Sequence, residues 1–277
     1  MRIADHAGRR LVVGRHSPLA AMDARPLLNK VAPVTLAFWI LKILATTLGE
    51  TAGDFLSMTL DLGYAVGLGV TAGLLGLLLV AQIGARRFHP ALYWAAIVGT
   101  TTAGTEVSDL MDRTLGLGYV LGSVLLASGL AAVLTAWWLR SRDLRVHPIA
   151  ARGTEIFYWA AILFSNSLGT AFGDFLTDTA GLSYGQGALV TAAVIGVVLL
   201  LHVTTRLSDV LLFWIAFVFT RPFGATFGDL LTKPVASGGL DLPRGAASLV
   251  TLALLVAVLA VSTWWASRPP KGHALSA

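Results

Sequence analysis

The 277-residue chain contains no cysteine, and only 13% of its residues are charged. The missing cysteine excludes a disulfide framework, a thiolate metal site and a cysteine nucleophile. The charged share is about half that of a typical soluble domain, whereas 56% of the residues are hydrophobic. The sequence also lacks any motif that pairs a nucleophile with a base, so we expect neither an enzyme nor a resident cofactor.

The apolar residues gather in long runs. A membrane-spanning helix needs about 20 mostly apolar residues, and only helices satisfy their backbone within the bilayer in runs of this length. The eight predicted spans are 34–58, 64–84, 91–112, 117–139, 155–177, 185–204, 209–232 and 245–265. We therefore predict an all-α integral membrane protein with eight transmembrane helices, whose main partner is the lipid bilayer.

Lysine and arginine are distributed unequally between the two sides of these spans. Fifteen lie on the side of both termini, and three, Arg113, Lys233 and Arg244, lie on the other. The positive-inside rule then predicts cytoplasmic termini for a bacterial inner-membrane protein. Because topology explains the net charge of +5, we expect no nucleic-acid partner. Lys42 and Arg221 fall within spans.

The predicted spans divide the chain into five parts. These are a basic cytoplasmic tail at 1–33, a first transmembrane half at 34–139, a cytoplasmic linker at 140–154, a second transmembrane half at 155–265 and a cytoplasmic tail at 266–277. The oligomeric state stays open, and a homo-oligomer is one possibility.

Four copies of one pattern fill the two halves. The copies align on Asp54, Asp109, Asp174 and Asp229. A tryptophan stands fifteen residues before each aspartate and a glycine five before: Trp39, Trp94, Trp159 and Trp214, then Gly49, Gly104, Gly169 and Gly224. Successive aspartates are 55, 65 and 55 residues apart. This spacing indicates that one repeat was duplicated and that the resulting pair was duplicated again, so that equivalent residues of the two halves are 120 positions apart. Each copy holds two spans, so the repeats are parallel.

The repeat predicts how the helices pack. The first helix of each copy carries the polar residues and should lie inside, because intramembrane charges avoid lipid, whereas the apolar second helices should form an outer shell. The glycine and a small residue four positions later form a close-contact face, which includes Gly49, Gly53, Gly169 and Gly173. We expect the tryptophans at a membrane interface. The aspartates lie roughly 22 Å from them along a helix, toward the periplasmic side.

Polar side chains recur on one stripe of each first helix, because residues four apart share a face. The stripes read Thr46, Glu50, Asp54; Thr101, Thr105, Asp109; Asn166, Thr170, Asp174; and Arg221, Ala225, Asp229, with Glu106 near the second stripe. The six acids exceed Lys42 and Arg221 by four formal charges. Such an excess inside a membrane requires protons, cations or water.

Carboxylate, hydroxyl and amide oxygens are the ligands of hard divalent cations. The sequence therefore predicts a site for a transported cation. Mn²⁺ is the first candidate, with Mg²⁺ or Ca²⁺ as options, and its transport would be coupled to protons. The predicted acids are Glu50, Asp54, Glu106, Asp109, Asp174 and Asp229, and the neutral donors are Thr46, Thr101, Thr105, Asn166 and Thr170. Lys42 and Arg221 are the predicted counter-ions, with Arg221 paired to Glu50 or Glu106.

Three segments carry a resemblance to a known family. They are KILATTLGETAGDFL (Lys42 to Leu56), NSLGTAFGDFL (Asn166 to Leu176) and GATFGDLLTKP (Gly224 to Pro234). The chain resembles a bacterial family of repeat-containing membrane-anchored proteins predicted in efflux pumps. The resemblance covers nearly all of the chain after the basic tail and implies an efflux-type role without naming a substrate.

Three functions remain open on the sequence. The first is an exporter of a hard divalent cation. The second is a proton- or sodium-coupled efflux carrier of an organic solute, in which the acids are coupling sites. The third is a non-transporting accessory subunit of an efflux system, in which the polar stripes only hold helices together.

Overall fold

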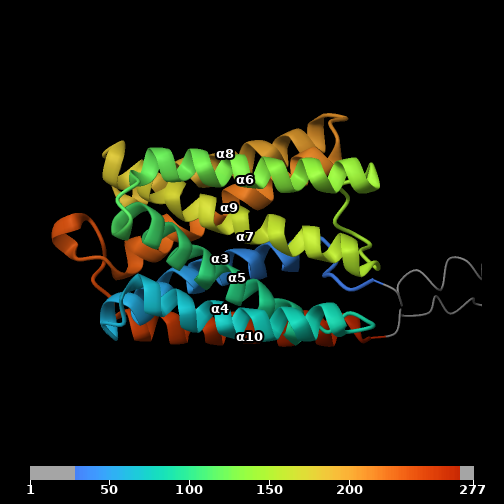
Figure 1. Ribbon diagram of the computed structural model, residues 1–277, viewed down its shortest axis with the longest axis horizontal. Coiled ribbons are helices and arrows are strands. Elements are labelled where there is room, and N and C mark those ends of the chain that lie inside the picture. The colour runs from blue at the N-terminus through green and yellow to red at the C-terminus, as the bar shows by residue number, and fades with distance from the viewer. Residues whose placement is uncertain (1–28, 269–277) are drawn as a thin grey trace, which may run out of the picture.

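A computed structural model describes residues 29–268, and most of them are helical (Figure 1). The eight α-helices of this range are α3 (Leu36–Asp54), α4 (Gly63–Gly84), α5 (Pro90–Asp109), α6 (Gly118–Ser141), α7 (Arg152–Asp174), α8 (Tyr184–Thr204), α9 (Asp209–Thr232) and α10 (Arg244–Ala266). Each coincides with one predicted span to within a few residues.

Six of these helices, α4 and α6 to α10, are long and apolar enough to cross a membrane. This is what a multi-pass membrane protein requires. Helices α3 and α5 fall outside that set. They carry Lys42, Glu50 and Glu106 among other buried polar residues.

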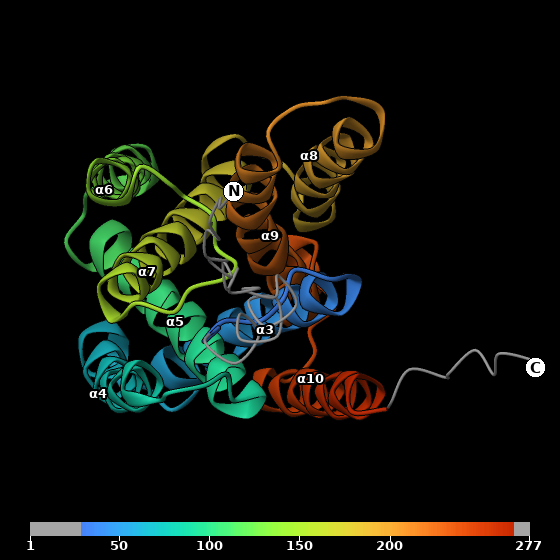
Figure 2. The ribbon, with the colours of Figure 1, turned by 90° about the vertical axis from the view of Figure 1, so that its right-hand side faces the viewer.

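The odd-numbered helices form an inner ring, and the even-numbered helices lie outside it (Figure 2). Helices α3 and α7 each pack on both α5 and α9. In the most apolar 18-residue stretch of each outer helix, 17% to 22% of the residues are buried. The corresponding values are 61% in α7 and 56% in α9. The prediction of polar inner and apolar outer helices is therefore confirmed.

Each outer helix packs mainly on the inner helix of the next repeat. Helix α4 lies on α5, α6 on α7, α8 on α9, and α10 closes the circle on α3 (Figure 2). The two sequence halves are consequently not separate four-helix units, because α5 meets α7 and α9 meets α3 across the boundary. The four repeats build one closed ring.

The repeated glycines allow the inner helices to approach closely. In each repeat a glycine stands five residues before the aspartate. This glycine faces a side chain of the next repeat, the one that stands eight residues before that repeat's own aspartate. The contacts join Gly49 to Thr101, Gly104 to Asn166, Gly169 to Arg221 and Gly224 to Thr46. A Cβ added to Gly53 or Gly173 would lie 3.1 Å or 3.2 Å from the next inner helix. The predicted close contacts of Gly49, Gly53, Gly169 and Gly173 are confirmed.

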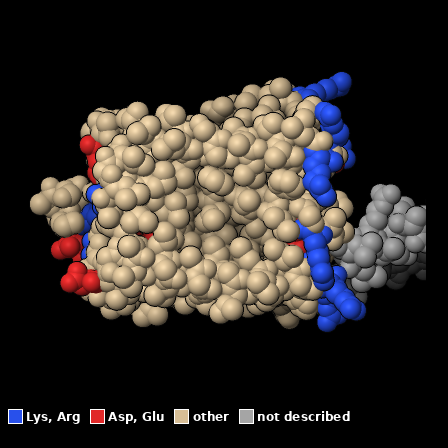
Figure 3. Space-filling model, in the orientation of Figure 1, with Lys and Arg blue, Asp and Glu red and all other residues tan. Residues whose placement is uncertain are grey.

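Charges gather at the two ends of the bundle and leave an uncharged band between them (Figure 3). The connections α3–α4, α7–α8 and α9–α10 carry exposed Asp61, Asp178 and Asp241, and we call this the acidic end. At the opposite, basic end the helix ends and connections carry exposed arginines. They are Arg86, Arg87, Arg140, Arg142, Arg145 and Arg206.

An aromatic layer fills the inner ring toward the basic end. Trp94, Trp159 and Trp214 are at most 7% exposed. Trp94 packs against Phe38 and Trp159 against Tyr93, so each contacts an aromatic ring of the preceding repeat. The expectation of interface anchors fails for these three tryptophans, because their side chains are buried within the bundle.

The expected N-terminal tail is partly packed structure. Residues 1–28 lie outside the described range, as does the predicted C-terminal tail beyond 268. Lys30 and Val31, however, are buried, and Lys30 forms an ion pair with buried Glu155. Asn29 bonds the ring of His147 across 3.0 Å, and burial lowers the pKa of that ring. The tail boundary at residue 33 is therefore too late.

Candidate functional site

Two polar layers cross the inner ring. The arginine layer consists of Lys42, Glu50, Thr105, Asn166, Thr170 and Arg221. The aspartate layer consists of Asp54, Asp109, Asp174, Asp229, Arg113, Lys233 and Arg244. Arg221 stands eight residues before Asp229, roughly 12 Å along the helix. Glu50 stands only four residues before Asp54, roughly 6 Å along the helix, so it lies between the two levels, and the aspartate layer is nearer the acidic end.

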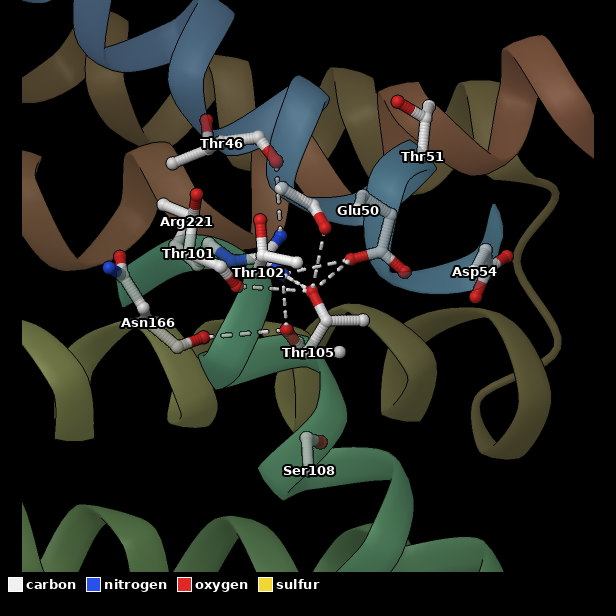
Figure 4. Close-up of polar contacts among 12 residues, drawn as sticks. Thr46, Glu50, Thr51, Asp54, Thr101, Thr102, Thr105, Ser108, Asn166 and Arg221 are labelled. Carbon is white, nitrogen blue, oxygen red and sulfur yellow. Dashed lines mark hydrogen bonds and ion pairs between the residues drawn. The ribbon is translucent and has the colours of Figure 1, made fainter. Parts of the chain in front are cut away.

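Arg221 holds the arginine layer together, and it is 0% exposed. Its Nη2 atom donates to Glu50 Oε2 at 2.9 Å, Thr105 Oγ1 at 2.5 Å and Thr170 Oγ1 at 2.6 Å. Figure 4 shows the guanidinium directed toward Glu50 and Thr105. One side chain of α9 thus ties together α3, α5 and α7. The expected pairing with Glu50 is present, as a buried guanidinium requires.

Lys42 does not pair with an acid. Its Nζ atom donates to Asn166 Oδ1 at 2.9 Å and lies 4.2 Å from the ring centroid of Phe217. Within the described residues no carboxylate oxygen lies within ion-pair distance of this ammonium group. Lys42 thus contacts an amide rather than an acid, and its role as a counter-ion stays a prediction. The layer holds two basic groups against the one carboxylate of Glu50.

The four aspartates are paired through two bases. Arg113 bridges Asp109 and Asp174, with both nitrogen–oxygen distances 3.0 Å. Lys233 bridges Asp229 at 3.1 Å and Asp54 at 2.8 Å. These two ion triads occupy positions 120 residues apart in the chain, so each triad ties one half of the sequence to the other. The aspartates lie at one level, as the parallel repeats predict.

The sequence reasoning missed these bases because hydropathy placed them outside the spans. Both stand four residues after an aspartate, where the other two repeats have Met58 and Asp178. In the first three repeats a π-helical turn follows the aspartate, and Leu110–Thr114 returns Arg113 to the ring. Such turns often mark functional sites.

The charge balance changes accordingly. Arg244 Nε also lies 3.5 Å from Asp54 Oδ2. The six predicted acids therefore stand against five basic groups rather than two. The formal excess is one negative charge, not four.

One group of acids has the spacing of a metal site. Glu50, Asp54 and Asp229 each offer a carboxylate oxygen, and these oxygens lie within 4.8 Å of one another. We call these three residues the acid cluster. All three are at most 3% exposed. Asp229 Oδ1 accepts no hydrogen bond from the described residues, although the Lys233 ammonium is 3.1 Å away. Asp109 and Asp174 are not part of this cluster.

Glu106 lies outside the acid cluster and faces away from the second stripe, near which it was predicted. Its two carboxylate oxygens lie 2.6 Å and 2.5 Å from Ser57 Oγ. Three residues along a helix leave a side chain about 60° from the stripe, and Glu106 consequently faces Gly67 of α4. Asp112, a buried acid that the sequence reasoning missed, accepts from Ser108. Asp112 stands three residues after Asp109, and residues three apart are neighbours on a helix, so this spacing could have indicated it.

The predicted neutral donors divide into two groups. Thr105 and Thr170 contact Arg221, and Asn166 contacts Lys42. Thr46 and Thr101 instead donate to backbone carbonyls of the adjoining inner helices, at 3.2 Å to Thr220 O and 2.9 Å to Ala45 O. Thr46 and Thr101 therefore join neighbouring inner helices in the described conformation, and their role as ion ligands stays a prediction.

The two ends of the ring are closed to different depths. Toward the basic end the Tyr93 and Tyr158 hydroxyls are hydrogen bonded to each other, and both residues are at most 1% exposed. Toward the acidic end the closing side chains are 12% exposed at Lys233, 28% at Arg113 and 25% at Arg244. The polar layers therefore lie nearer to the surface at the acidic end.

Comparison with known proteins supports the repeat. A repeat family matches the chain at residues 37–88, 92–143, 157–208 and 212–268, one match for each inner and outer helix pair. Comparison with curated proteins and with solved structures gives no match. The matched segments cover most of the sequence. The chain therefore belongs to the family described as Repeat of Unknown Function (DUF347).

Proposed function

We propose that the protein is a transporter that exports a hard divalent cation from the cytoplasm, with Mn²⁺ as the leading substrate and Mg²⁺ or Ca²⁺ as options. All eight described helices would cross a bacterial inner membrane, with the basic end in the cytoplasm according to the positive-inside rule. The acid cluster of Glu50, Asp54 and Asp229 carries this proposal.

The charge of the acid cluster suits a divalent ion. Arg221 lies 2.9 Å from Glu50 and balances its charge. Asp54 and Asp229 then provide two negative charges, which equal the charge of the ion once both Lys233 and Arg244 have moved away. Three carboxylates can supply up to about six oxygens, the number that such ions take, and water completes a smaller set.

The route of the ion follows from the two closures. The acidic end would open to the outside by movement of Lys233 and Arg244. The aromatic layer would separate the acid cluster from the cytoplasm in the described conformation. Glu106, whose described contacts are with Ser57 and not with a base, is the proposed site of a coupled proton. Intramembrane acids of this kind commonly serve proton relays.

The test is Mn²⁺ transport by the purified protein in liposomes. Asp54→Asn keeps the side-chain shape and removes one charge of the acid cluster, so we expect a loss of about tenfold or more in transport rate. Asp174→Asn is the matched control, because it stands 120 residues away in the other triad, and we expect it to keep most of the rate. Normal Mn²⁺, Mg²⁺ and Ca²⁺ transport by Asp54→Asn would contradict the proposal.

One observation favours an accessory subunit as the second candidate. Thr46 and Thr101 bond to neighbouring backbone, and all four aspartates are ion-paired, as expected if the polar residues only join helices. The purified protein alone would then transport no cation, and Asp54→Asn would lower thermal stability instead.

A further inference from the structure

We infer that Lys233 is a built-in competitor of the transported cation: its ammonium group occupies the acid cluster, leaves when the cation binds, and returns to expel it. This inference rests on the proposed function and adds the residue that controls release.

The ammonium already occupies the position that a cation needs. Lys233 Nζ lies 2.8 Å from Asp54 Oδ2 and 3.1 Å from Asp229 Oδ1. These are two of the three acids of the cluster. An ammonium and a divalent ion that share two carboxylates repel each other, so they occupy the site in turn.

The chain around Lys233 permits such a movement. Lys233 is the C-terminal cap of α9, with extended backbone, and the connection to α10 follows directly. Its side chain is 12% exposed, whereas those of Asp54 and Asp229 are 2% and 4% exposed. A lysine side chain has a flexible four-carbon stem and a compact charge. The ammonium can therefore withdraw toward the acidic end without movement of the inner helices.

The equivalent base in the other triad differs in backbone and head group, although its side chain is more exposed, at 28%. Arg113 lies within a π-helical turn, and its guanidinium reaches Asp109 through Nε and Asp174 through Nη2. Two separate nitrogen contacts fix a planar group more firmly than one ammonium does. The residue that corresponds to Glu50, Thr170, is uncharged, so the third acid is also missing there.

The experiment measures Mn²⁺ affinity of the purified full chain from the paramagnetic resonance signal of free Mn²⁺. Lys233→Gln removes the competing charge, and we expect about tenfold tighter binding than in the wild-type protein. Lys233→Arg keeps the charge and should bind no more tightly than wild type. Unchanged or weaker binding by Lys233→Gln, in protein that elutes as wild type in size exclusion, would overturn the inference.

The absence of cysteine allows a direct rescue of the charge. In Lys233→Cys, aminoethyl methanethiosulfonate adds an ammonium group through a disulfide, and methyl methanethiosulfonate adds an uncharged methylthio group. We expect the first reagent to return the Mn²⁺ affinity toward the wild-type value and the second to leave it high. A residue that only joins α9 to α3 would not produce this difference, and equal effects of both reagents would refute the inference.

Two controls separate this inference from the proposed function. Arg113→Gln removes the equivalent base outside the acid cluster, and its Mn²⁺ affinity should stay within about threefold of wild type. If Asp54→Asn leaves Mn²⁺ binding intact, the proposed function fails. If Asp54→Asn abolishes binding while Lys233→Gln leaves the affinity unchanged, only the role of Lys233 as competitor fails.

Discussion

The two ion triads of the aspartate layer occupy equivalent places and differ in chemistry. Asp109, Arg113 and Asp174 form the first, and Asp229, Lys233 and Asp54 form the second. Each base comes from the position four residues after its own aspartate and reaches the aspartate of the next repeat. The repeat thus reproduces the pairing of each base with two aspartates. The two bases differ in side chain and in backbone, because Arg113 lies in a π-helical turn and Lys233 caps α9 with extended backbone.

The difference shows how a duplicated framework can acquire one specialised site. Arginine in the first triad contacts two acids through different nitrogens and suits a permanent connection. Lysine in the second holds the same two positions with one compact charge. Glu50 adds a third acid only to the second triad, and Arg221 balances it from the position where the first half has Thr101.

The largest expected effect separates Arg221 from its equivalent, Thr101. Arg221→Ala leaves buried Glu50 without its base and should lower the free energy of unfolding by about 3–5 kcal/mol. Thr101→Ala removes hydroxyl hydrogen bonds and should cost about 1 kcal/mol. Thermal unfolding in detergent compares the two.

A double-mutant cycle sharpens that comparison. Glu50→Gln in the Arg221→Ala background should restore part of the lost stability, because the unpaired charge is gone. If the effects of the two changes on the free energy of unfolding were additive, Arg221 and Glu50 would not interact.

The next prediction concerns the close helix contacts. A Cβ at Gly169 would lie 2.5 Å from Arg221 Cβ, whereas one at Gly73 in outer helix α4 meets nothing within 4 Å. Gly169→Ala should therefore destabilise the protein by about 1–3 kcal/mol. Gly73→Ala should be neutral or stabilise it by up to about 1 kcal/mol. Equal unfolding temperatures for the two variants would argue against the ring of glycine contacts.

Exchange of the two bases tests the triads themselves. Lys233→Arg makes the second triad resemble the first, and a firmly held guanidinium should slow Mn²⁺ transport about tenfold without loss of fold. Arg113→Lys should change the rate by less than about threefold, because the first triad only joins helices in this account. Transport in liposomes measures both, and a larger loss in Arg113→Lys would reverse the assignment.

The smallest effect on stability is expected for Glu106. This acid contacts Ser57 and has no base within ion-pair distance among the described residues. Its neutral form therefore suits the site, and Glu106→Gln should change the free energy of unfolding by less than about 1 kcal/mol. The proton coupling of transport, followed with a pH-sensitive dye inside the liposomes, should nevertheless be lost. Retained coupling would exclude Glu106 as the proton site.

Much of this architecture could be predicted because it follows from local pattern. Apolar runs gave the helices, and the fixed offsets around Asp54 and its equivalents gave the repeat, the inner helices and the glycine contacts. The pairing of Arg221 with Glu50 followed from the cost of an unpaired buried charge.

The remainder depended on geometry between helices. Arg113 and Lys233 looked like loop residues, because they follow the apolar runs and hydropathy does not reveal that each base reaches back to an aspartate. Trp94 was expected at an interface, because the sequence does not reveal that aromatic rings of the preceding repeat bury it. Glu106 was placed on the wrong face since three residues do not complete a helical turn.

The most direct test of the central claim is anomalous diffraction from crystals of the full chain grown with Mn²⁺, in the wild-type protein and in Asp54→Asn. The account predicts one manganese peak among Glu50, Asp54 and Asp229 in the wild-type protein, with Lys233 displaced, and no peak there in the variant. A peak between Asp109 and Asp174, or Mn²⁺ transport in a protein with no peak in the ring, would contradict it.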